Sequence, residues 1–322
     1  MKKFYLILLI CFLSINLLSQ TAKKTGTVLP KDILYKFELI KFYMQQQELD
    51  LALTYIDSTL EESIIKDSLY YFKGLIFKEK KDWDKAADYF AESLMGCSKE
   101  SLIDITTSEL KNTLKKLSPM HAIEKVSFYI NKITDTEKLI HFLFIIAEIY
   151  EETQLFAEAN DVYKTILKEM DYENEIKLNL KIASNHIFLK EFEEALATLE
   201  PIITLNDSIY NEDALFIYYI ANYSVEDFEK AKKSLLKLYL EYPNHRNRTE
   251  IIMGLSEIYE HESQYLLSWY LLNELYKMGS EAQKFIIYRE ISRIKKLLAQ
   301  DTLTVDQFKN FKPVFEEIEE NE

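Results

Sequence analysis

Residues that make turns and loops are scarce in this chain. Its 322 residues include only five Gly and five Pro. Five scattered glycines cannot build a phosphate-binding loop, and no Gly-flanked serine nucleophile is present. Tyr and Phe are abundant, at 22 and 19 residues, and Leu, Ile, Glu and Lys are frequent. Because this mixture favours helices over turns, the composition predicts long helices with short connections.

Cysteine and positive charge are also in short supply. The two cysteines are Cys11 and Cys97, and 39 Lys and Arg face 53 Asp and Glu, a net charge of −14. If Cys11 is lost with an N-terminal signal, Cys97 remains alone, which excludes an internal disulfide and a cysteine metal cluster. An acidic surface repels phosphate backbones, so we expect no nucleic-acid partner. The five histidines show no metal-ligand spacing, so we expect no metal and no cofactor.

A continuous apolar run occurs at the N-terminus. Residues 1–19, MKKFYLILLICFLSINLLS, begin with two lysines and continue with about fifteen mostly apolar residues, the pattern of a secretory signal peptide. The run is shorter than the ~20 residues of a spanning helix, although an uncleaved membrane anchor remains the alternative. Ile10 is bulky where a lipoprotein signal needs a small residue before its cysteine. We therefore predict an exported chain, in the periplasm or at the periplasmic face of an outer membrane.

Small residues recur along the chain at intervals of 34 to 37 residues. We call these residues the anchors: Ala52, Ala86, Ala122, Ala159, Ala195, Ala231 and Ser268. A large apolar residue stands three positions before each anchor, except at Pro119, and another stands four positions after it. Small residues such as Gly74 stand twelve positions before several anchors. These spacings predict a two-helix unit, in which the second helix carries the anchor.

The best copy of the unit, Ser68 to Gly96 with Gly74, Trp83, Ala86 and Phe90, resembles the tetratricopeptide repeat. The resemblance covers residues 32–278 in about seven units, of which residues 101–133 are the most degenerate. It implies an all-α, right-handed α-solenoid (superhelix) of helix-turn-helix repeats. Residues 281–298 form an amphipathic pattern typical of a C-terminal capping helix, with Arg289, Arg293, Lys295 and Lys296 outward. The predicted organisation is thus a signal peptide (1–19), a linker (20–31), a solenoid (32–300) and an acidic tail (301–322).

The resemblance implies protein binding rather than catalysis. Adjacent glutamates such as Glu193 and Glu194 diverge by about 100° on a helix, so they do not form an acid–base pair, and we expect neither an enzyme nor a small-molecule substrate. Some side chains lie at first-helix offsets that the resemblance places on the concave wall, where partners dock. These residues are Tyr71, Phe144, Glu148, Leu180, Ile187, Phe188 and Phe216. We expect partner proteins or peptides with apolar and basic residues, and membrane association only through such partners.

Three functions fit this pattern. The first is a protein-interaction scaffold in the bacterial cell envelope. The second, within the same class, is a tetratricopeptide component of outer-membrane protein assembly or of the envelope and division machinery. The third is a repeat module of an envelope enzyme or glycan-binding protein. It is disfavoured because no stretch of 80 or more non-repeat residues is present to hold such a site.

Overall fold

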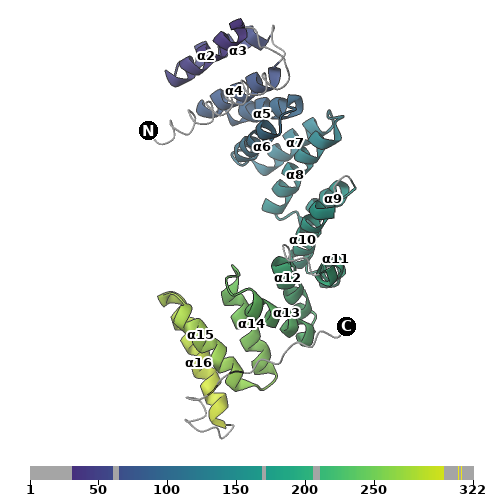
Figure 1. Ribbon diagram of the computed structural model, residues 1–322, viewed down its shortest axis with the longest axis vertical. Helices are drawn as coiled ribbons and strands as arrows, with labels where there is room; N and C mark the ends of the chain where they lie inside the picture. The colour runs from purple at the N-terminus through teal and green to yellow at the C-terminus, as the bar shows by residue number, and fades with distance from the viewer. Residues whose placement is uncertain are drawn as a thin grey trace. The chain divides into compact units, whose positions relative to one another are not determined.

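The computed structural model describes residues 31–60, 65–168, 172–205 and 211–300, together with Phe311 and Pro313. The predicted signal peptide and nearly all of the predicted linker lie outside these residues, as does most of the acidic tail. The described residues form fifteen α-helices and no strand, as predicted (Figure 1). None of the helices in these ranges is both long enough and apolar enough to cross a membrane.

The chain divides into two compact units, residues 1–155 and 156–322, which we call the N-terminal and C-terminal units. The helices of the N-terminal unit are α2 (Lys31–Gln45), α3 (Leu49–Leu60), α4 (Lys66–Glu79), α5 (Trp83–Gly96), α6 (Glu100–Leu114), α7 (Pro119–Ile130) and α8 (Thr136–Glu152). Those of the C-terminal unit are α9 (Phe156–Ile166), α10 (Tyr172–Leu189), α11 (Phe192–Leu205), α12 (Asn211–Ser224), α13 (Phe228–Glu241), α14 (Arg248–His261), α15 (Tyr265–Met278) and α16 (Glu281–Gln300).

The helices alternate as the repeat predicts. Even-numbered helices from α2 to α14 are the first helices of seven pairs, odd-numbered helices from α3 to α15 are the second, and α16 follows the last pair. Every second helix begins three residues before its anchor, and all seven anchors are buried. At Gly74 a β-carbon would come within 2.6 Å of the Phe90 ring. Small residues are therefore required where first and second helices cross.

Six of the seven pairs share one turn. The residue five positions before the anchor has a positive φ of 61–63°: Gln47, Lys81, Gln154, Lys190, Glu226 and Ser263. The next residue donates its backbone N–H to the carbonyl nine positions before the anchor, over 2.7 to 2.9 Å, which is the Schellman bond that ends a helix. None of these residues is glycine, although glycine adopts this conformation most easily. Turns of this kind explain how the chain makes short connections with so few glycines.

The third pair makes a different turn. Four residues separate α6 from α7, and Pro119, the misfit in the sequence pattern, is the first residue of α7. Proline suits this position, because its φ is already helical and its missing N–H would have no partner there. The degenerate repeat thus keeps its anchor, Ala122, and replaces only the turn.

Packing within each unit follows the order of the chain. In the N-terminal unit consecutive helices pack from α2 to α6, α7 packs on α8, and first helices also touch one another, α4 with α6 and α6 with α8. In the C-terminal unit consecutive helices pack from α9 to α16, and α10 also contacts α12. First helices therefore share one side of each unit, which is where the sequence places the candidate binding residues.

Candidate functional site

Two of the predicted binding residues are buried, so the prediction that they face a partner is wrong. Tyr71 of α4 is 2 % exposed, with its ring 5.7 Å from that of Phe90 on the second helix of the same pair. Leu180 of α10 is 8 % exposed and belongs to a core cluster with Ala183 and Leu199. Both stand fifteen positions before their anchor, and in these two pairs the side chain at that offset is buried.

The first helices of the N-terminal unit carry ion pairs between repeats. Lys78 of α4 pairs with Glu109 of α6, Lys111 of α6 with Glu148 of α8 over 2.8 Å, and Lys115, directly after α6, with Glu152 of α8 over 2.6 Å. The bond to Glu152 raises the pKa of Lys115. Because Glu148 already has a lysine partner, its carboxylate is less available to a basic ligand than the sequence suggests. Phe144, the other predicted residue on α8, is half-buried.

In the C-terminal unit one predicted residue is largely exposed. Phe188, near the end of α10, is 63 % exposed, and its ring stacks on that of Phe156 at a centroid distance of 4.7 Å and an interplanar angle of 12°. Ile187 beside it is half-buried. The preceding residue, His186, is buried and lies 2.7 Å from a carboxylate oxygen of Glu191 through Nδ1. This arrangement holds a flat apolar surface in place at the end of the helix.

Phe216 of α12 is the remaining predicted residue. It is half-buried and packs with Tyr219 and His245, at centroid distances of 5.8 and 5.4 Å. Burial raises the pKa of Tyr219 to about 12, so this phenol is neutral at physiological pH. Phe216 therefore contributes part of its ring to the surface and part to the core.

Cys97 and His141 are titratable side chains in the described ranges whose pKa values are shifted by burial. Burial raises the pKa of the lone Cys97 thiol to about 11 and lowers the pKa of His141. A thiol with that pKa is protonated at neutral pH and is a poor nucleophile. No group of three or more His, Cys, Asp or Glu that could hold a metal occurs in the part of the chain that the structure describes.

Sequence reasoning missed the apolar residues exposed on the two end helices. Tyr35 and Phe42 project from α2, and Phe285 and Tyr288 project from α16. The outward basic residues predicted on α16 are indeed exposed, but aromatic rings accompany them. The available signal was position, because α2 and α16 are the first and last helices of the described ranges, and within these ranges each has a sequence neighbour on one side only.

The arrangement of anchors, helix starts and buried partner residues is that of tetratricopeptide helix pairs. The fold is of the tetratricopeptide kind. No protein-family model and no curated protein matches the chain.

Similar solved structures include a double mutant of MamA RS-1, with 16 % identity, 61 % of this chain and 96 % of that chain covered, and a TM-score of 0.42. A tetratricopeptide repeat protein from Parabacteroides merdae has 12 % identity, 83 % and 100 % coverage, and a TM-score of 0.41. PilW, a type IV pilus biogenesis factor, has 13 % identity, 70 % and 100 % coverage, and a TM-score of 0.42.

Proposed function

We propose that this protein is a non-catalytic scaffold of the bacterial cell envelope. It binds other proteins through the exposed side chains of its first helices, which we call the first-helix surface. The observation that carries the proposal is the exposed Phe188 ring stacked on Phe156. A stacked ring loses little conformational freedom on binding, and exposed aromatic side chains are typical anchors at protein interfaces. Ile187 and the outer part of Phe216 add apolar surface from the same set of first helices.

The partner is proposed to present apolar side chains flanked by basic ones. The net charge of −14 favours a basic partner over an acidic one by long-range attraction. The paired Glu148 and Glu152 moderate this preference in the N-terminal unit. In the C-terminal unit, the α10 residues Phe188 and Ile187 supply the apolar part of the surface.

Binding is tested with two substitutions in the full chain. Phe188→Ala, alone and with Phe144→Ala, is compared with Leu240→Ala, which removes another largely exposed apolar side chain, from the second helix α13. A partner purified from envelope extract with the wild-type protein should bind Phe188→Ala roughly 30-fold more weakly, the equivalent of about 2 kcal/mol. It should bind Leu240→Ala unchanged. Equal affinity of all variants, with helicity intact by circular dichroism, would remove the first-helix surface from the proposal.

Export is tested separately. The proposal requires that residues 1–19 direct the chain across the inner membrane, as the sequence predicts. Fractionation of cells expressing the full chain should find the protein with periplasmic markers, and mass spectrometry should find a mature N-terminus at residue 20 or 23. A full-length chain in the cytoplasmic fraction would refute the envelope location and leave the binding surface as a separate question.

A further inference from the structure

The last helix, α16, repeats the pattern of a first helix. Its buried residues Ile287, Ile291 and Ile294 lie 36 residues after Ile251, Leu255 and Ile258 of α14, which are buried as well. Each of the two helices packs on the second helix that precedes it, α14 on α13 and α16 on α15. This interval falls within the 34 to 37 residues that separate successive anchors, so α16 occupies the place of the first helix of an eighth pair.

The adjacent side of α14 shows what the second helix of an eighth pair would cover. There Ile252 and Ser256 are buried, and the Ser256 hydroxyl lies 2.8 Å from the hydroxyl of the anchor Ser268 on α15. Thirty-six residues later stand Tyr288 and Ser292 on α16. Tyr288 is 61 % exposed, and Phe285, one turn before it, is 78 % exposed.

We call Phe285, Tyr288, Ser292, Lys295 and Lys296 the open face of α16. Helical spacing places these residues on one side of the helix, next to the side that packs on α15. Within the described ranges, no second helix covers them and neither Lys295 nor Lys296 has an ion-pair partner. The open face thus combines two exposed rings, a small residue at the crossing position and two uncommitted cations, on a chain that is otherwise acidic.

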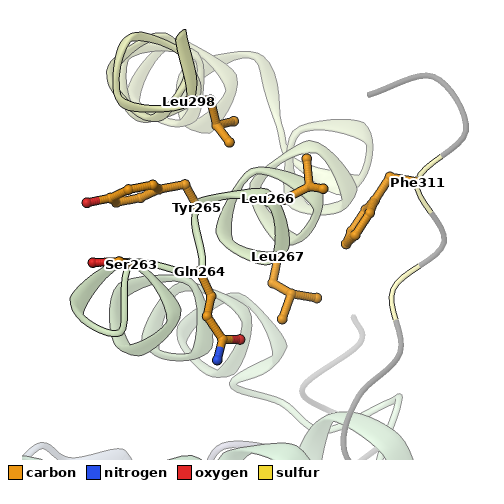
Figure 2. A pocket seen from close by; sticks show the side chains of 7 residues that line it. All are labelled: Ser263, Gln264, Tyr265, Leu266, Leu267, Leu298 and Phe311. Carbon is orange, nitrogen blue, oxygen red and sulfur yellow. The ribbon is translucent and has the colours of Figure 1, made fainter. Parts of the chain in front are cut away.

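Phe311 marks one border of the open face. Figure 2 shows it beside Leu266 and Leu267 of α15, with Leu298 of α16 on the far side of a shallow pocket. Its ring also meets that of Tyr270 at 6.2 Å. Leu298 and Phe285 are thirteen residues apart, or about 20 Å along a helix at 1.5 Å per residue. Phe311 therefore lies at one end of α16 and leaves the rings at the other end uncovered.

Phe311 lies beside two positions of α15 whose counterparts in α5 contact the next repeat. Leu266 and Tyr270 stand two residues before and after their anchor. In α5 the same positions are Asp84 and Asp88, which contact His121 and Lys125 of the following second helix, α7. In α15, within the described ranges, Leu266 shares a pocket with Phe311 and Tyr270 meets its ring.

We propose that the open face of α16 binds an acidic amphipathic helix of a partner protein, which takes the place that a second helix has in the seven pairs. Apolar residues of that helix pack on Phe285 and Tyr288, a small residue crosses at Ser292, and carboxylates pair with Lys295 and Lys296. The chemistry differs from that of the first-helix surface, which is proposed to accept basic partners. The two surfaces lie on different helices and are separable by mutation.

A second helix of this protein serves as the probe. A labelled peptide of residues 82–96, DWDKAADYFAESLMG, has four acids, one lysine and the anchor Ala86. Fluorescence anisotropy with the full mature chain should show saturable binding that weakens as salt is raised. The double variant Phe285→Ser/Tyr288→Ser and the double variant Lys295→Glu/Lys296→Glu should each weaken binding at least tenfold. Leu240→Ser, on α13, should leave it unchanged.

Three results would overturn the proposal. One is the absence of saturable binding, or equal binding by all variants. Another is binding that rises at least tenfold when Glu316, Glu317, Glu319 and Glu320 are changed to Gln in the full chain, because the chain's own acidic end would then be the occupant. The third is a wild-type dimer in sedimentation that Phe285→Ser/Tyr288→Ser abolishes, because a second copy would then fill the face. None of these variants alters Phe188, so the outcome is independent of the proposed function.

Discussion

The contact between Gly74 and Phe90 gives the sharpest stability prediction. A β-carbon at position 74 would lie 2.6 Å from two ring carbons of Phe90 and 3.0 Å from a third. The ring cannot move aside easily, because Phe90 is completely buried and packs on Tyr71. Gly74→Ala therefore forces α4 and α5 apart.

The magnitude follows from two opposing effects. Overpacking a well-filled core costs about 1–3 kcal/mol, and a contact this short belongs at the upper end of that range. Alanine favours a helix interior over glycine by about 1 kcal/mol, which offsets part of the cost. We expect Gly74→Ala to lower the free energy of unfolding by about 1–2 kcal/mol.

Gly96 provides a matched control in the same pair of helices. The nearest atom to a β-carbon there is the Asp67 β-carbon at 3.6 Å, an ordinary contact. Gly96→Ala should therefore be neutral or stabilise by up to about 1 kcal/mol. Identical chemical changes at two helical glycines are expected to have effects of opposite sign.

The assay uses the positions of the two tryptophans. Trp83 lies in the N-terminal unit and Trp269 in the C-terminal unit, so Trp269→Phe leaves Trp83 as the reporter for α4 and α5. Urea unfolding followed by Trp83 emission gives the stability change from the shift in midpoint at constant slope. Replacing Phe90 by Leu should remove the penalty of Gly74→Ala, with a coupling of about 1 kcal/mol or more. A neutral or stabilising Gly74→Ala would refute the packing of this pair.

Three further predictions concern single residues. Lys190 has a φ of 62° in the turn between α10 and α11. Lys190→Gly should therefore raise the stability of the C-terminal unit by about 0.5–1 kcal/mol, whereas Lys190→Ala should not. Urea unfolding reported by Trp269 in a Trp83→Phe background measures both changes. Ala86→Phe should destabilise by about 1–3 kcal/mol because the anchor is fully buried, and an unchanged melting temperature would contradict the repeat register. Because burial raises the pKa of Cys97 to about 11, its reaction with a disulfide reagent at pH 8 should be slow in the native protein and fast in urea, and equal rates would show that the thiol is accessible.

The sequence predicts the helix pairs because the anchor positions tolerate only small residues. Ala86, Ala159 and Ala231 each lie where two helices cross, so their period is visible without a structure. The turns are less visible, since the left-handed residues at Lys81 and Lys190 are not glycine. Their conformation follows from the helix ends on either side, not from local preference.

The binding surface is harder to predict than the fold. Tyr71 and Phe144 share an offset of fifteen residues before their anchors, yet Tyr71 is buried and Phe144 is partly exposed. The difference depends on which rings pack beside them, as Phe90 does beside Tyr71. The acid Glu148 likewise has a partner, Lys111, that stands 37 residues earlier and is not identifiable from the repeat template.

The most direct test of protein binding through the first-helix surface is site-specific photocrosslinking in living cells. Phe188 is replaced by p-benzoylphenylalanine, which keeps an aromatic ring at the same place, and Leu240 is replaced in a parallel strain as an exposed control on a second helix. We predict that irradiation links the protein to a defined partner through position 188 and not through position 240. Crosslinks at position 240 alone, or none at either position in cells where the protein is exported, would contradict the account.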